Sequence, residues 1–126
     1  MTDDISIYVV GVNQSIKEAL TTITHNLSRC AIVTRDNDIV VGVVSEGDVI
    51  RMLLDDISLY TPIGKVIKPS FRYLTKNDML AALRLLQNIG ITLVPIVDET
   101  YQLKDVITIH QVLKYFLQKL GDDTTT

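Results

Sequence analysis

The chain repeats itself at half its own length, and this repeat limits the possible folds more than any other feature. Ala19 matches Ala82 and Ser45 matches Thr108, so each pair is separated by 63 positions (19 to 82, 45 to 108) in a sequence of 126 residues. Such a period indicates two copies of one structural unit. Because a unit of about 60 residues buries little surface alone, we expect the two copies to pack face to face and share a core.

The first copy predicts the element order β-α-β-β-α. Apolar, β-branched runs indicate strands, and apolar residues at helical spacing indicate helices. Ser15 and Glu18 have the spacing of a capping box, so a helix is expected to begin there. The predicted elements are strands at 5–12, 30–34 and 39–44, a helix at 16–27, and a helix from 45 to 54 or 57.

The second copy predicts the same order, which gives a mixed α/β (α+β) fold. Gly90 and Gly121 are expected to end its two helices. We place the first repeat at 1–62, the second at 63–121, and a polar, disordered tail at 122–126. The predicted elements are strands at 71–74, 91–97 and 103–108 and helices at 79–89 and 111–120.

Composition excludes several classes of protein. The net charge is −3 with no run of consecutive basic residues, which argues against nucleic-acid binding. No apolar run approaches the roughly 20 residues of a membrane span, and the acidic start Met1–Asp4 is unlike a signal peptide. One cysteine, Cys30, suggests a reducing compartment. We therefore expect a soluble, cytoplasmic protein that binds neither nucleic acid nor membrane.

Catalytic and metal-binding constellations are not expected. His25 and His110 are far apart in the sequence, and neither lies in a cluster with the spacing of metal ligands. With one cysteine and two isolated histidines, no nucleophilic triad can be argued. The sequence predicts no metal site, no required cofactor and no enzymatic activity.

The stretch Gly42–Leu54 predicts a strand that turns into a helix. Ser45 can cap that helix, and the free amides and dipole at a helix start favour phosphate. Asp48 lies three residues further on, where its carboxylate could hold two sugar hydroxyls. These features indicate a nucleotide site. The competing explanation is that Ser45 and Asp48 only stabilise the helix as a cap and a first-turn acid.

The two units resemble a tandem pair of CBS domains, also called a Bateman module. The family motif is glycine, two apolar residues, Ser or Thr, two variable residues and aspartate. The stretch from Gly42 to Asp48 matches this motif in full, and Val94–Asp98 is similar to the family's central strand and turn. Ser45–Ile67 is also similar to CBS pairs that precede sugar-phosphate nucleotidyltransferase domains, although the chain has no glycine-rich nucleotidyltransferase loop.

The resemblance implies regulatory binding of an adenosine-containing ligand, such as AMP, ADP, ATP or S-adenosylmethionine, in a cleft between the halves. Ser45 would contact phosphate or ribose and Asp48 would accept from the ribose hydroxyls. Arg51, one turn beyond Asp48, could reach a phosphate. The expected ligand-binding residues are Val43, Ser45, Gly47, Asp48, Arg51, Lys68, Phe71, Ile91 and Thr92.

The second repeat departs from the motif. Asp105 replaces the glycine and Gln111 replaces the aspartate, whereas Thr108 is kept. A neutral amide makes weaker bonds than a carboxylate, and Asp105 brings negative charge towards any phosphate. We therefore predict one competent site and a weaker second site at Thr108 and Gln111.

Two other functions stay open. The pair could be a structural dimerisation module that binds no ligand, or the regulatory fragment of a nucleotidyltransferase. The family likeness also implies a homodimer in which helices pair two modules into a flat disc. The helical stripes that could form this face are Leu83, Leu86 and Ile89, and Val112, Leu113, Phe116 and Leu117.

Overall fold

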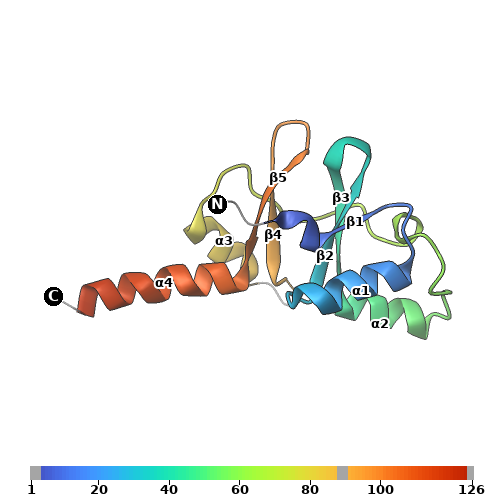
Figure 1. Ribbon diagram of the computed structural model, residues 1–126, viewed down its shortest axis with the longest axis horizontal. Coiled ribbons are helices and arrows are strands. Elements are labelled where there is room, and N and C mark those ends of the chain that lie inside the picture. The colour runs from blue at the N-terminus through green and yellow to red at the C-terminus, as the bar shows by residue number, and fades with distance from the viewer. Residues whose placement is uncertain (1–3, 88–90, 125–126) are drawn as a thin grey trace.

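A computed structural model describes residues 4–87 and 91–124 of the chain. Two small α/β halves stand side by side, and the last helix projects from one end (Figure 1). The elements in chain order are η1 (Ile5–Tyr8), β1 (Val9–Gly11), α1 (Ile16–Asn26), β2 (Cys30–Arg35), η2 (Asp36–Asp38), β3 (Ile39–Ser45), α2 (Glu46–Leu54), η3 (Ile63–Lys65), α3 (Met79–Leu86), β4 (Leu93–Val97), β5 (Leu103–Thr108) and α4 (Ile109–Thr124).

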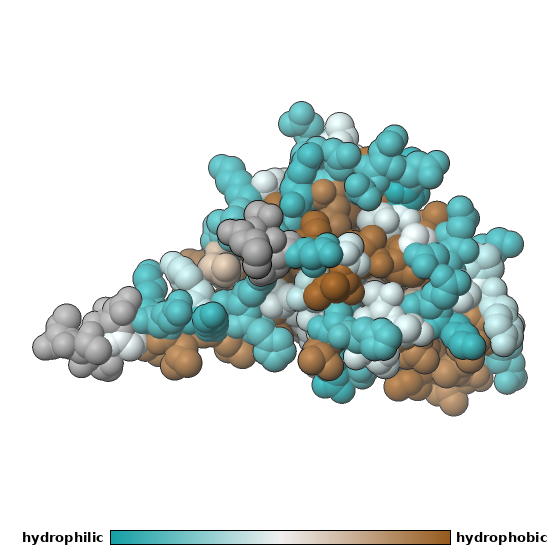
Figure 2. All heavy atoms as spheres, in the orientation of Figure 1, coloured by the Kyte–Doolittle hydropathy of each residue, from teal (hydrophilic) through white to brown (hydrophobic). Residues whose placement is uncertain are grey.

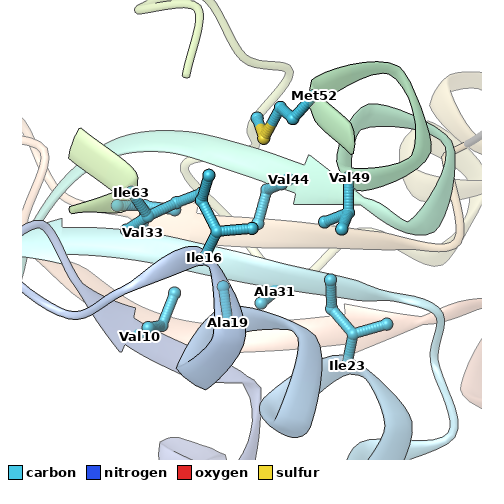
Figure 3. Close-up of a cluster of buried hydrophobic side chains, with 10 residues drawn as sticks. All are labelled: Val10, Ile16, Ala19, Ile23, Ala31, Val33, Val44, Val49, Met52 and Ile63. Carbon is cyan, nitrogen blue, oxygen red and sulfur yellow. The ribbon is translucent and has the colours of Figure 1, made fainter. Parts of the chain in front are cut away.

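The first half is a three-stranded sheet in the order β1-β2-β3, with α1 and α2 packed against it. β1 runs parallel to β2, and β2 and β3 form an antiparallel hairpin in which Cys30 lies opposite Ser45. Ile16 and Ile23 of α1 and Val49 of α2 point into one buried apolar cluster (Figure 3). The 3.6-residue spacing of these side chains explains why the helices lie on the sheet with this face inward.

The second half is the antiparallel pair β4–β5 with α3 and α4. The strand expected at 71–74 contributes one parallel bridge, between Leu74 and Ile96. The apolar stripes predicted for a dimer face divide between two environments. Val112 is buried and Phe116 packs beside it against α3 and the strands, whereas Leu113 and Leu117 of α4 are exposed. Ile89 and the predicted helix end at Gly90 lie outside the described residues.

A second buried cluster joins the halves. Cys30, Ile32 and Val40 from the first half pack with Leu93, Val97 and Val106 from the second. The loop ends of the two hairpins are also tied together, because the Val40 amide donates to the Tyr101 carbonyl at 2.9 Å and the Gln102 side chain donates to the Asn37 carbonyl at 3.0 Å. The predicted mixed fold of two repeats packed face to face is confirmed.

Three local predictions were wrong, and the first is the strand at 71–74, of which only the Leu74–Ile96 bridge forms. Ile5–Val12 was expected to be one strand, but the Asp4 carboxylate accepts from the Ser6 amide at 3.0 Å and starts a 3₁₀ turn, so only Val9–Gly11 is extended. The last helix was expected to end before Gly121, yet α4 continues to Thr124, into the predicted tail. A glycine costs a helix only about 1 kcal/mol, and no proline follows to stop the helix.

The segment after Pro62 packs on the first half. Ile63 is fully buried in the first cluster, and Val66 and Ile67 lie against the same cluster. The Gly64 amide donates to the Val12 carbonyl at 2.9 Å. The first core therefore includes residues on both sides of the predicted boundary between 62 and 63. That boundary stays a prediction about the repeat units of the sequence.

Candidate functional site

One cleft of about 970 Å³ lies between the two halves. The first half lines it with the end of β3, the start of α2 and the residues before β2. The second half lines it with the linker before α3 and the residues that enter β4. The lining residues are Arg29, Cys30, Val43, Ser45, Glu46, Gly47, Asp48 and Arg51 from the first half, and Ser70, Phe71, Arg72, Ile91, Thr92 and Leu93 from the second.

The β3–α2 corner presents a capping box at the mouth of this cleft. The Asp48 amide donates to the Ser45 hydroxyl at 3.1 Å, and the Ser45 amide donates to Asp48 Oδ2 at 2.9 Å. Both residues are partly exposed. The structure thus confirms Ser45 as a helix cap and shows that Asp48 also contributes to the cap.

Arg51 occupies the other oxygen of the same carboxylate. Its guanidinium donates to Asp48 Oδ1, and both side chains remain partly open to solvent. A Cβ added at Gly47 would lie 3.5 Å from Arg51 Nη1, which shows that the guanidinium lies against the start of α2. Both oxygens of Asp48 therefore have protein donors, one neutral and one charged.

The wall from the second half combines apolar and hydroxyl groups. The Thr92 hydroxyl donates to the Ser28 carbonyl and lies 3.2 Å from Cys30 Sγ. Phe71 is half-buried and packs at a tilt against Tyr73, with ring centroids 5.5 Å apart. This wall offers a flat ring, an aliphatic side chain at Ile91 and one hydroxyl, which suits a planar ligand with a polar edge.

Cys30 lies at the floor of the cleft, where only 2% of it is exposed. Burial raises the pKa of its thiol, and the hydrogen bond from Thr92 opposes this shift in part. The thiol is therefore neutral at physiological pH and less nucleophilic than an exposed cysteine. The sequence placed Cys30 in a strand core, which is correct, but gave no sign that it borders a cavity.

Eight of the nine residues expected to bind a ligand line this one cleft; Lys68 does not. Lys68 lines an adjoining cavity of about 410 Å³ with Val43, Asp48, Arg51 and Ser70. The sequence analysis missed six lining residues: Arg29, Cys30, Glu46, Ser70, Arg72 and Leu93. The repeat offers a signal for one of them, since Arg29 is 63 positions before the expected residue Thr92.

Comparisons with known proteins identify this architecture. The sequence profile of the CBS domain matches residues 1–55. CBSX2, whose crystal structure is in complex with AMP, is 25% identical, and the match covers 94% of this chain and 93% of that one with a TM-score of 0.75. The chain has the fold of a tandem pair of CBS domains. A CBS domain protein from Pyrobaculum aerophilum complexed with AMP is 22% identical over 82% of the pair and 80% of that chain, with a TM-score of 0.68.

The CBS pair also resembles two uncharacterized proteins of Helicobacter pylori. They are 34% and 32% identical to it over 113 residues, which is 87% of the pair. The match spans 34% of the length of each relative, so the pair corresponds to about a third of these proteins.

The two halves of the CBS pair carry equivalent caps with different chemistry. The Thr108 amide donates to Gln111 Oε1 at 2.8 Å, and the Gln111 amide donates to the Thr108 hydroxyl at 3.3 Å. Thr108 is 4% exposed, and neither residue lines the 970 Å³ cleft. The Asp105 carboxylate accepts from the Val106 amide at 2.8 Å. Gln111 therefore reproduces the capping role of Asp48 without its charge.

The parts of the CBS pair that the structure describes contain no group of three or more His, Cys, Asp or Glu side chains arranged to hold a metal ion. Within the same residues, no helix is both long and apolar enough to span a bilayer.

Proposed function

We propose that this CBS pair is a regulatory module that binds an adenosine-containing nucleotide in the cleft between its halves. The gathering of eight expected ligand-binding residues around one cavity of about 970 Å³ carries the proposal. That volume lies in the range of small-molecule sites. AMP in the crystal structures of CBSX2 and of the Pyrobaculum aerophilum protein supports an adenine nucleotide as the ligand class.

Each proposed contact follows from the chemistry of the lining. Asp48 accepts from the ribose hydroxyls, because a carboxylate is a stronger acceptor than a neutral group and the other carboxylate of the lining, Glu46, is paired with Arg29. The amides at the start of α2 and the Ser45 hydroxyl lie where phosphate is favoured. Phe71 and Ile91 offer apolar surface to the adenine ring, and the Thr92 hydroxyl can bond to its edge.

The regulatory part of the proposal rests on the composition of the cleft walls. Residues from both halves line the cavity, so a bound nucleotide contacts both. A ligand shifts a conformational equilibrium only by its difference in affinity for the two states. A nucleotide that bridges the halves favours the arrangement in which both walls reach it, and no reaction on the nucleotide is required.

The deciding experiment is titration calorimetry on ligand-stripped protein with AMP, ADP, ATP and S-adenosylmethionine, supported by thermal-shift measurements. We expect one site per chain and a rise in melting temperature with at least one ligand. Asp48→Asn keeps an acceptor for the Ser45 amide but removes the charge, and we expect it to weaken binding at least tenfold. Two equal sites per chain, or no binding of any adenylate, would contradict the proposal.

A structural dimerisation module is the second candidate, and exposed leucines on two helices favour it. Leu53 and Leu54 of α2 and Leu113, Leu117 and Leu120 of α4 all point to solvent. In Figure 2, hydrophobic residues gather along α4 and again over α2 on the side of the molecule away from the hairpin loops. We propose that this side mediates a homodimer, which is compatible with nucleotide binding.

We further propose that the module acts in a cytoplasmic protein and controls a partner enzyme, of which a sugar-phosphate nucleotidyltransferase is the class favoured by Ser45–Ile67. Adding AMP to a complex of this pair with such an enzyme should change the enzyme's rate. An enzyme rate that is unchanged by every adenylate that the pair binds would reject this assignment.

A further inference from the structure

The Asp48–Arg51 ion pair stands where two cavities meet. Both residues line the 970 Å³ cleft and also the adjoining cavity of about 410 Å³, and Val43 and Ser70 are shared in the same way. The pair therefore lies on the boundary between the two spaces. A ligand that reaches Asp48 from the larger cleft also meets Arg51.

The proposed ribose contact competes with Arg51. Two vicinal sugar hydroxyls can each donate one hydrogen bond. They bind a carboxylate best when each donates to a different carboxylate oxygen. Oδ2 already accepts from the Ser45 amide, and Oδ1 accepts from the Arg51 guanidinium. Each carboxylate oxygen has a second lone pair, so the neutral amide can be shared, but a closely bonded guanidinium on Oδ1 obstructs a second donor.

We propose that Arg51 makes this cleft select adenosine ligands that carry a 5′ phosphate over adenosine and S-adenosylmethionine. This inference rests on the proposed function. When ribose hydroxyls engage Asp48, the Arg51 guanidinium loses part of its carboxylate partner. A phosphate on the ligand replaces that partner with a bidentate acceptor. Adenosine supplies no replacement, and S-adenosylmethionine has a sulfonium cation at its 5′ position, where AMP has its phosphate, with its carboxylate several bonds further out and beside an ammonium group.

Among the charged groups of the cleft, Arg51 is the one that connects ribose binding to phosphate binding. Arg29 is paired with Glu46 at 3.3 Å, at the opposite side of the β3–α2 corner. Arg72 has no ion-pair partner among the residues described, so it adds attraction for any anion whether or not Asp48 is engaged. Arg51 is the one cleft cation bonded to the carboxylate that we assign to ribose. Binding of the ribose to Asp48 therefore weakens the Asp48–Arg51 ion pair and leaves the Arg51 guanidinium available to a phosphate.

The test measures the affinities of AMP, adenosine and S-adenosylmethionine by calorimetry for the wild-type chain, Arg51→Ala and Arg51→Gln. We expect wild type to bind AMP at least tenfold more tightly than either other ligand. We expect Arg51→Ala to weaken AMP about tenfold while adenosine binds equally well or better, because Asp48 is freed. Arg51→Gln should behave like Arg51→Ala, since it lacks the charge.

Arg84→Ala is the matched control, because Arg84 is an exposed arginine on α3 that lines neither cavity. It should leave the AMP-to-adenosine ratio unchanged. The inference is overturned if Arg51→Ala keeps that ratio, if it weakens both ligands equally, or if Arg84→Ala changes the ratio as much. In these cases wild type still binds AMP, whereas failure of wild type to bind any adenylate rejects the proposed function itself.

Discussion

Asp48 has a structural role that must be separated from any role in binding. Its carboxylate caps α2 through the Ser45 amide, and Gln111 caps α4 through the Thr108 amide in the same way. We expect Asp48→Ala and Gln111→Ala each to lower the free energy of unfolding by about 0.5–2 kcal/mol, the usual cost of losing a cap. Urea unfolding monitored by circular dichroism measures this.

The same two variants should differ in nucleotide binding. Asp48→Ala should abolish binding, whereas Gln111→Ala should leave the dissociation constant within about twofold of the wild-type value. Equal loss of binding in both variants would show that helix capping, and not the Asp48 carboxylate, supports the site.

The Cys30 thiol should make stability depend on pH in alkaline solution. Its pKa in the folded protein is raised above the ordinary value of 9.0 by burial. The unfolded chain therefore loses this proton first, so the stability is complete below about pH 9 and declines as the pH rises towards the folded-state pKa. Denaturant unfolding between pH 8 and pH 10 should show a smaller decline for Cys30→Ala than for wild type. Parallel curves would contradict this prediction.

At this scale the sequence predicted the site well where a residue belongs to a local motif. Ser45 and Asp48 are three positions apart, so helix geometry alone brings them together. Arg29 and Arg72 were missed because tertiary packing, which no local pattern encodes, brings the segments before β2 and before α3 to one cleft.

Among the elements, the segment η3 depends on a close approach of two backbones. A Cβ added at Gly64 would lie 2.8 Å from Val12 Cβ and 2.9 Å from the Val12 carbonyl oxygen, and the Gly64 amide donates to that same oxygen. We expect Gly64→Ala to cost about 1–3 kcal/mol of stability, as overpacking usually does. Thermal unfolding would detect the loss.

Gly121→Ala is the control for this substitution. Among the described residues, apart from its chain neighbours and the nearby backbone of its own helix, no heavy atom lies within 4 Å of the added Cβ, and the residue lies in α4. Because alanine is favoured over glycine in a helix by about 1 kcal/mol, this variant should be neutral or slightly stabilising. A Gly64→Ala variant as stable as Gly121→Ala would show that η3 moves freely on the first half.

Element type was more predictable than element extent. Helices with a regular apolar stripe, such as α1 and α2, were correctly predicted, as was the hairpin of β2 and β3. The segment 5–12 was misassigned because its β-branched residues favour a strand, whereas the Asp4 cap turns its first four residues into a 3₁₀ helix. A single side chain-to-backbone bond outweighed the propensity of the run.

At the scale of the whole molecule, the exposed leucines of α2 and α4 predict self-association. Leu54 is 76% exposed and Leu117 is 70% exposed, and each lies on a helix whose opposite side faces a core. We expect sedimentation velocity to show a dimer of the wild-type chain that Leu117→Glu or Leu54→Glu converts to monomer. Circular dichroism should be unchanged, because both side chains lie outside the buried clusters.

Lys114→Glu offers a matched control on α4, since Lys114 is exposed and not apolar. It should leave the sedimentation coefficient unchanged. A wild-type chain that sediments as a monomer at micromolar concentration would remove the homodimer from the proposal, while nucleotide binding could still be tested.

The bond between the two hairpin ends has a mechanical consequence. The Val40 amide and the Tyr101 carbonyl join the halves through main-chain atoms of residues that do not line the cleft, so this contact resists separation of the halves at the hairpin ends. Beside the cleft the halves meet through side chains: the Thr92 hydroxyl donates to the Ser28 carbonyl, and Cys30 and Leu93 belong to one apolar cluster. We expect that a ligand that displaces Thr92 changes the angle between α2 and α4, which a partner bound to both helices would detect.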